Sequence, residues 1–181
     1  MSKKNIYYIA KLAVYTILAI LVLVLTDNLL EHLRPFIGGL MILYGVEEML
    51  HGFLFHRHHF FHEGKIYLGL IELIFGTILI ASDLKFEYVC IIWATWSIVR
   101  ESYEFEEIAV DIKTLIPKIV SGSESIVVIV LSVLLILEPG HHHALTHMYL
   151  LVVELILSPL IILMDELLLN YLKKRKEKPN Q

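Results

Sequence analysis

An apolar run that ends in an acidic residue occurs three times in this chain. The runs cover residues 21–27, 76–83 and 132–138. Their last residues, Asp27, Asp83 and Glu138, lie 56 and 55 residues apart, and a second apolar stretch follows each of them. Recurrence at a nearly fixed spacing indicates a repeated structural unit. The predicted unit is a hairpin of two membrane-length helices joined by a short acidic connector, and three such hairpins fill the chain.

The chain is too apolar for an ordinary soluble domain. Hydrophobic residues make up 57% of its 181 residues, whereas soluble domains contain about 45–50%. A helix needs about 20 mainly apolar residues to cross about 30 Å of hydrocarbon. Six segments come close to this length, although the third is short: residues 6–25, 35–55, 66–81, 86–103, 119–137 and 145–170. Because helices satisfy their backbone hydrogen bonds internally in lipid, the sequence predicts an all-α integral membrane protein with six transmembrane helices.

The six predicted helices form a single domain, residues 1–172. Its three hairpins cover about residues 6–55, 66–103 and 119–170, and residues 173–181 form a basic cytoplasmic tail. No small-x-small cleavage site follows the first apolar segment, so we expect it to be retained as a membrane anchor rather than removed as a signal peptide.

Residues 104–118 differ from the predicted spans. Charged residues alternate there with apolar ones at helical spacing, which is typical of a helix lying along the membrane interface. Pro117 and the Ser121-Gly122-Ser123 cluster are expected to end this segment before the fifth span.

The distribution of basic residues predicts the orientation. With six spans, both termini and the connectors after the second and fourth helices share one side. That side receives 13 of the 15 Lys and Arg residues, and the other side keeps Arg34 and Lys85. Because basic residues concentrate on the cytoplasmic side of membrane proteins, both termini are predicted to be cytoplasmic.

Ionisable residues interrupt four of the predicted spans. They are Glu47, Glu48, Glu72, Arg100, Glu101 and Glu154. A charge at mid-bilayer costs about 2.5–3.5 kcal/mol on insertion scales, so such residues pair, protonate or face a cavity. One hypothesis is that Arg100 pairs with Glu47, Glu48 or Glu101 while Glu72 or Glu154 carries a proton. The alternative is that these residues form packing hydrogen bonds, or lie close enough to the interface to reach water.

Glycines are concentrated in the second and third predicted spans. They are Gly38, Gly39, Gly45, Gly69 and Gly76. Small residues allow membrane helices to approach closely, so close packing within or between hairpins is the main expectation. Lining a substrate path is the other.

Histidines form two main groups. The first, at the cytoplasmic end of the second span, contains His51, His56, His58, His59 and His62; the second, on the outer connector with Glu138, contains His141, His142, His143 and His147. Neutral imidazole binds transition metals, so a loose metal site is one interpretation, and ordinary loop polarity is another. The outer group allows a third, because imidazole titrates near pH 6.5 and would gain charge as the exterior acidifies.

The sequence contains no recognisable catalytic signature. Nucleophile-elbow, P-loop, dinucleotide and metalloprotease motifs are all missing, so we expect no enzyme and no cofactor. Basic residues are confined to the ends of the spans, which suits lipid headgroups and gives no reason to expect nucleic acid. The expected partner is the lipid bilayer, with a homo-oligomer or a membrane partner as further options.

Three segments of the chain resemble a known family. Residues 66–83 (IYLGLIELIFGTILIASD), 36–45 (FIGGLMILYG) and 121–140, with Pro139 after the odd-numbered helix, are similar to the HdeD family of bacterial acid-resistance membrane proteins. The resemblance covers nearly the whole chain. It implies a multi-pass protein of the bacterial inner membrane linked to acid stress, and it transfers no catalytic residue.

The favoured hypothesis is therefore a non-enzymatic, HdeD-type membrane protein that contributes to acid or envelope stress tolerance. The first alternative is a small proton or metal-ion transporter or channel that uses the intramembrane carboxylates and histidines. The second is a membrane scaffold that binds a partner or lipid.

Overall fold

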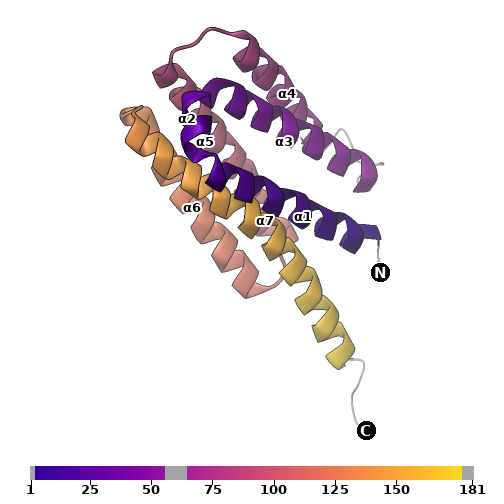
Figure 1. Ribbon diagram of the computed structural model, residues 1–181. Coiled ribbons are helices and arrows are strands. Elements are labelled where there is room, and N and C mark those ends of the chain that lie inside the picture. The colour runs from indigo at the N-terminus through magenta and orange to yellow at the C-terminus, as the bar shows by residue number, and fades with distance from the viewer. Residues whose placement is uncertain (1–2, 56–64, 177–181) are drawn as a thin grey trace. The chain divides into compact units, whose positions relative to one another are not determined.

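The computed structural model describes residues 3–55 and 65–176, and within these ranges all regular elements are helices, joined by short connectors (Figure 1). The described residues form seven helices: α1 (Lys3–Val24), α2 (Thr26–Glu31), α3 (Leu33–Phe55), α4 (Lys65–Ala81), α5 (Phe86–Asp111), α6 (Leu115–Leu137) and α7 (His141–Lys176). The expectation of an all-α fold is confirmed.

Three of the helical segments are long and apolar enough to cross a membrane. They are Ile6–Val24, Leu115–Leu137 and His141–Leu169, and Ile66–Ala81 is a shorter apolar helix. Large apolar side chains cover their outer surfaces; Ile17 of α1 and Leu137 of α6, for example, are 61% and 76% exposed. An exposed surface of this kind is suited to lipid, because hydrocarbon removes the cost of leaving it uncovered.

The connectors after the acid-ended runs are short. Asp27 lies in the first turn of α2, where a negative charge complements the helix dipole. Asp83 follows α4, and Glu138 ends α6, donating its backbone N–H to the carbonyl of Leu134. All three acidic side chains are exposed. The repeat therefore marks real helix ends.

The segment between α5 and α6 differs from the prediction. A separate interfacial helix over residues 104–118 is wrong, because α5 continues to Asp111 and α6 begins at Leu115. Pro117 lies in the first turn of α6, where the N–H that proline lacks would have no helical partner. Residues 121–123 are inside α6, and the Ser123 hydroxyl donates to the carbonyl of Val120. Pro117 therefore starts the helix rather than breaking the chain before it.

The described chain divides into two compact units. The larger unit contains α1, the part of α5 from Ala94 onward, α6 and α7. The smaller unit contains α2, α3, α4 and the beginning of α5, up to Trp93.

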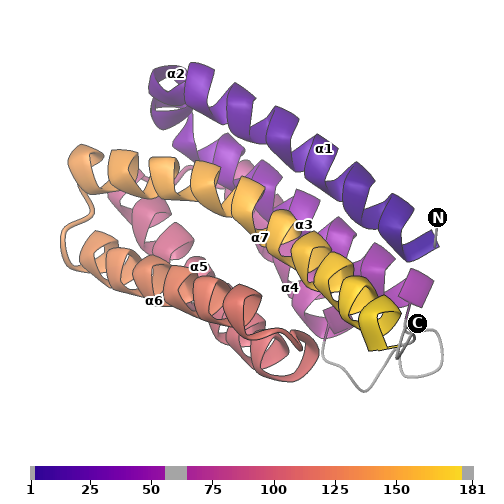
Figure 2. The ribbon, with the colours of Figure 1, turned by 90° about the horizontal axis from the view of Figure 1, so that it is seen from below.

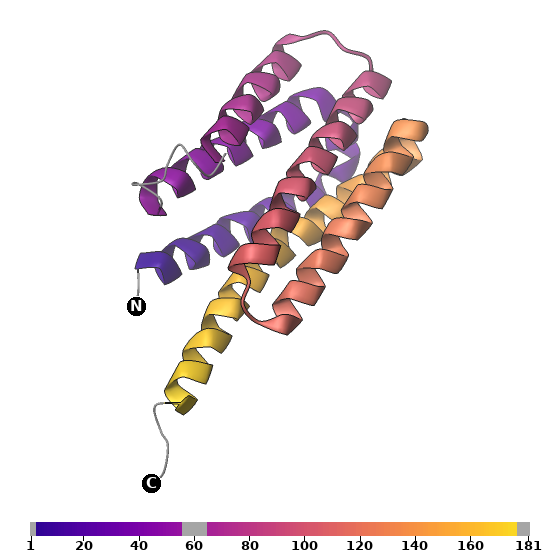
Figure 3. The same cartoon turned by 180° about the vertical axis from the view of Figure 1, so that it is seen from behind.

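In the larger unit, α7 lies between α1 and α6 (Figure 2). The later part of α5 runs beside α6 in the opposite direction (Figure 3). Ala144, Met148 and Leu151 of α7 are buried, and so are Tyr15 and Ala19 of α1. Their spacing of three, four or seven residues places them on one face of each helix, which is the pattern of a packed helical seam.

In the smaller unit, α3 and α4 pack against each other as an antiparallel pair (Figure 1). Gly38 faces Gly76, and Gly45 faces Gly69, seven residues further along each helix. A methyl group on Gly45 would lie 2.5 Å from the carbonyl oxygen of Gly69, and one on Gly76 would lie 2.6 Å from that of Gly38. The two backbones touch at both levels, which confirms the expectation of close glycine packing. The sequence analysis had assigned these two helices to different hairpins.

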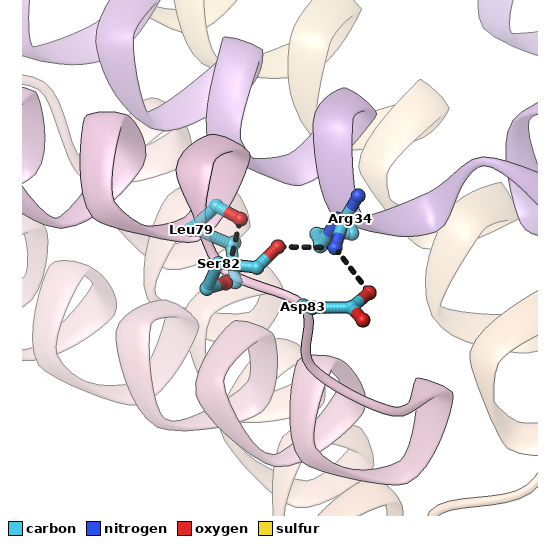
Figure 4. A network of polar contacts seen from close by, with 4 residues as sticks. All are labelled: Arg34, Leu79, Ser82 and Asp83. Carbon is cyan, nitrogen blue, oxygen red and sulfur yellow. Dashed lines mark hydrogen bonds and ion pairs between the residues drawn. The ribbon is translucent and has the colours of Figure 1, made fainter.

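Arg34 links the beginning of α3 to the end of α4 (Figure 4). Arg34 of α3 donates from Nη1 to the carbonyl of Ser82 and to Oδ1 of Asp83, the latter at 3.1 Å. The Ser82 hydroxyl in turn donates to the carbonyl of Leu79 at 2.9 Å. Arg34 therefore satisfies a carbonyl at the end of α4, one of the groups that a helix leaves without an internal partner.

Candidate functional site

The later part of α5 presents a row of polar side chains on one face. Arg100, Glu101 and Glu104 follow Ser97 by three, four and seven residues, a pattern that aligns side chains along one side of a helix. Ser97, Arg100 and Glu101 are buried, at 7%, 6% and 2% exposure. The face of α5 that an apolar helix would fill with Leu or Val here carries hydroxyl, guanidinium and carboxyl groups.

Arg100 is held by carboxyl groups from two helices. Its Nη2 donates to Oε1 of Glu104 at 2.7 Å, one turn further along α5. Its Nε lies 3.8 Å from Oε1 of Glu154 on α7. The guanidinium carbon also lies 6.0 Å from the centre of the Trp96 ring, within the range of a cation–π contact. These contacts fix the position of the charge between α5 and α7.

Helix α6 adds a further carboxyl group. Ser125 donates a hydrogen bond to the carboxylate of Glu101. The neighbouring Glu124 interacts electrostatically with Glu101, Glu104 and Glu154. Its Oε1 is fully buried and has no hydrogen-bond partner within the described part of the chain. We call Arg100, Glu101, Glu104, Glu124 and Glu154 together the arginine centre.

The arginine centre lies at one level of the predicted spans. Glu124 is thirteen residues before the end of α6 at Leu137, and Glu154 is thirteen residues after the start of α7 at His141. At 1.5 Å per residue both are about 20 Å from the connector that joins these antiparallel helices. In the predicted six-span arrangement, with a hydrocarbon layer about 30 Å thick, this depth lies within the membrane. The centre contains four carboxyl groups and one guanidinium, so it has a surplus of acidic groups that can bind protons.

A second buried polar pair lies one turn of α5 away from the centre. The Ser97 hydroxyl and Nε2 of His147 form a hydrogen bond of 3.2 Å, whose donor depends on the tautomer of the imidazole. His147 is 3% exposed. The sequence analysis placed it with the connector histidines, but α7 starts immediately after Gly140, so that His147 falls in the second turn and on the buried face with Ala144 and Met148.

The other outer histidines lie in the first turn of α7. His141 and His142 are exposed and His143 is half-buried. His143 Nε2 lies 3.3 Å from Oε2 of Glu138, and its ring makes an edge contact with His142 at 5.6 Å between centroids. An imidazole–carboxylate pair therefore lies at the amino-terminal end of α7.

The remaining site residues from the sequence lie in the smaller unit. Glu72 of α4 is 1% exposed, while Glu47 and Glu48 of α3 are half-buried. The pairing of Arg100 with Glu47 or Glu48 stays a prediction. Of the first histidine group, His51 ends up half-buried near the end of α3, and His56, His58, His59 and His62 lie outside the described residues.

Two members of the arginine centre were missed from the sequence. Glu104 was assigned to an interfacial segment, although its spacing of four residues from Arg100 is that of a helical ion pair. Glu124 was not selected, although it is the one acidic residue in the apolar run of α6. The rule that selected Glu72 and Glu154 applies equally to Glu124 and was sufficient to find it.

The sequence also gives no indication of the role of Asp165, which is structural. Its Oδ1 accepts hydrogen bonds from the backbone N–H of Thr114, at 2.9 Å, and from the Thr114 hydroxyl. Thr114 is the residue before α6, and its own side chain does not cap the helix. A carboxylate of α7 thus binds the residue immediately before α6 and joins the amino-terminal end of α6 to α7.

Across residues 3–55 and 65–176, no group of three or more His, Cys, Asp or Glu side chains is arranged to hold a metal ion. Comparison of the chain with protein-family models, with curated proteins and with solved structures gives no match. The site is therefore interpreted from its own geometry and charge.

Proposed function

We propose that the chain is a non-enzymatic, multi-pass protein of a bacterial inner membrane that contributes to acid tolerance by exchanging protons at the arginine centre. In this proposal the six spans form three hairpins with both termini in the cytoplasm. The resemblance to the HdeD family suggests the physiological setting, and the contacts of the larger unit suggest the chemistry.

One observation carries the proposal: two carboxyl groups contact a single buried guanidinium, and two more, on Glu101 and Glu124, interact electrostatically with the carboxyl groups of this set. If all five groups were ionised, the centre would hold three surplus negative charges in a medium that solvates charge poorly. Like charges at close range in such a medium favour the uptake of protons. The charge of the centre therefore follows the supply of protons, which is the property that a proton-exchanging protein needs.

The role of Arg100 is to hold the centre together. Its contacts with Glu104 and Glu154 join α5 to α7. A fixed positive charge also keeps part of the carboxyl set ionised, so that the centre can both accept and release protons.

Proton exchange is better supported than the two other hypotheses. Metal transport requires a ligand set, and the described residues supply none. A scaffold that only binds lipid or a partner protein has no need of buried charges inside the bundle, because each of them costs free energy in the membrane. The transported ion is therefore the proton.

Proton flux into proteoliposomes tests the proposal. Purified protein is reconstituted with a pH-sensitive dye inside the vesicles, and a potassium potential with valinomycin drives proton movement. We expect acidification above that of protein-free vesicles, a fall of at least tenfold for Glu154→Gln, and no fall for Glu87→Gln, which removes an exposed carboxyl from the first turn of α5. Acidification equal to that of protein-free vesicles would overturn the proposal.

The proposed topology has a separate test. In a Cys90→Ser background, single cysteines are introduced at Lys85 and at Lys113, and intact cells are treated with a membrane-impermeant maleimide. The six-span arrangement predicts labelling at position 85, on the outer side, and protection at position 113. Labelling of both, or of position 113 alone, would refute it.

A further inference from the structure

We infer that protons reach the arginine centre from the outer end of the larger unit through His147 and Ser97. This inference rests on the proposed function and adds the route, which the charge of the centre alone does not specify. The buried His147–Ser97 pair is the observation from which it starts.

The first part of the route follows α7. His143 lies in the first turn, half-buried and 3.3 Å from the exposed carboxylate of Glu138. His147 follows four residues later, so the two rings are on the same side of α7, with about 5–6 Å between their Cβ atoms. An imidazole can accept a proton at one ring nitrogen and release one from the other. A half-buried imidazole near the start of α7 is thus followed by a buried one.

The second part crosses from α7 to α5. Nε2 of His147 and Oγ of Ser97 are 3.2 Å apart, within hydrogen-bond distance, and both residues are buried. Glu101 follows Ser97 by one turn of α5 on the same face and is 2% exposed. Glu101 interacts electrostatically with Arg100, Glu104 and Glu154. The polar face of α5 therefore places a hydroxyl and a carboxyl one turn apart between the imidazole and the centre.

Each transfer on this route conserves atoms and charge. A proton that binds one ring nitrogen of His147 gives an imidazolium, which releases its other ring proton from Nε2 to Ser97 Oγ. The hydroxyl proton of Ser97 moves on to the carboxylate of Glu101, and the imidazole returns to its neutral form. The serine hydroxyl suits this task because it accepts and donates at the same oxygen.

A buried serine on α6 is a separate observation that supports a polar route. Ser132 is 0% exposed, and its Oγ has no hydrogen-bond partner within the described residues. It lies seven residues from Ser125, on the same buried face of α6 as Val128 and Leu135. An unpartnered buried hydroxyl is unfavourable in a core that serves packing alone. The buried face of α6 thus also carries a hydroxyl on the outer side of the centre.

The test replaces the two members of the pair and uses matched controls on the same helices. His147→Gln keeps a side chain that can hydrogen-bond with Ser97 but carries no proton, and Ser97→Ala removes the hydroxyl. The controls are His142→Gln, an exposed histidine of α7, and Ser102→Ala, an exposed serine of α5. In the vesicle assay we expect at least a tenfold lower proton flux for each variant of the pair and unchanged flux for both controls.

A second readout separates the route from the site. Infrared difference spectroscopy after a jump of external pH follows the carbonyl band of protonated carboxyl groups, with Glu154→Gln used to assign it. For His147→Gln we expect the final amplitude of the wild type with a rise at least tenfold slower. A structural role for His147 would instead change the amplitude, because the centre itself would be altered.

The outcomes distinguish the two proposals. If vesicles containing the wild-type protein carry no proton flux, the proposed function fails and the route with it. If the wild type carries flux that Glu154→Gln abolishes, while His147→Gln and Ser97→Ala leave it unchanged, the route alone is wrong. Should His147→Gln fail to fold, as judged by gel filtration and circular dichroism, Ser97→Ala decides the question.

Discussion

Adding one methyl group at Gly45 tests whether direct backbone contact between α3 and α4 holds the smaller unit together. The new Cβ would lie 2.5 Å from the carbonyl oxygen of Gly69, 3.0 Å from Cγ of Leu73 and 3.1 Å from its backbone nitrogen. Ordinary contacts of a Cβ atom are 3.4–4 Å. Two of the three neighbours are backbone atoms, so no side chain can rotate away, and α4 itself has to move by roughly 1 Å.

The magnitude follows from a comparison with Gly39. That glycine lies on the same helix, is exposed, and has open space where its Cβ would be placed. Both Gly→Ala changes remove the same helix-propensity penalty of about 1 kcal/mol. Only Gly45→Ala overpacks the helix pair, which typically costs about 1–3 kcal/mol. We therefore expect Gly45→Ala to be about 1–3 kcal/mol less stable than Gly39→Ala.

Equilibrium unfolding in mixed micelles, followed by circular dichroism, measures this difference. Gly76→Ala repeats the experiment from α4, since its Cβ would lie 2.6 Å from the carbonyl oxygen of Gly38. Equal stabilities of Gly45→Ala and Gly39→Ala would refute the argument, because they would show that α3 and α4 have room between them that the structure does not contain.

Three further predictions concern the larger unit. Arg100→Gln leaves the buried carboxyls without their cation and is expected to lower the free energy of unfolding by about 3–5 kcal/mol. Adding Glu154→Gln should restore part of this loss. Additive effects of the two substitutions in this double-mutant cycle would contradict the pairing of Arg100 with Glu154. Asp165→Ala removes the hydrogen bonds to Thr114 and should cost about 0.5–2 kcal/mol in the same unfolding assay, with faster amide exchange at the start of α6; unchanged exchange would contradict it. Ser132→Ala deletes a buried hydroxyl that lacks a described partner and is expected to leave stability unchanged or raise it by up to about 1 kcal/mol, so a clear loss of stability would contradict that view of Ser132.

The positions of the helices were largely readable from the sequence. Apolar runs near membrane length and the acid-ended repeat located the carboxyl-terminal ends of α4 and α6, at Ala81 and Leu137. The errors arose where local signals compete. Pro117 is a helix breaker in most positions but favourable in a first turn, and only the location of the preceding Thr114 decides between the two. The sequence did not predict which helices pack together. Glycines seven residues apart indicate a close helix contact, but they do not identify the partner helix.

The candidate site was predictable in its composition but not in its pairing. Arg100, Glu101 and Glu154 stand out because charge is rare in apolar segments, and that rule needs no structure. The partners of Arg100 depend on the rotation of α5, which an apolar helix with few polar residues does not reveal. The location of His147 was not predictable for the same reason. Its closeness in sequence grouped it with His143, but α7 begins right after Gly140, and this places His147 on the buried face of the helix.

The two units use different means to hold helices together, and the contrast bears on the purpose of the arginine centre. In the smaller unit, paired glycines bring α3 and α4 into direct backbone contact, which is a common way for membrane helices to associate. In the larger unit, α5, α6 and α7 meet around one guanidinium and four carboxyls, although replacing buried ion pairs by apolar side chains is often neutral or stabilising. Packing alone therefore gives no reason for this chain to carry a surplus of three acidic groups there. A centre whose charge changes with proton supply does give one, and it accounts for the surplus as well as for the single cation that keeps it in place.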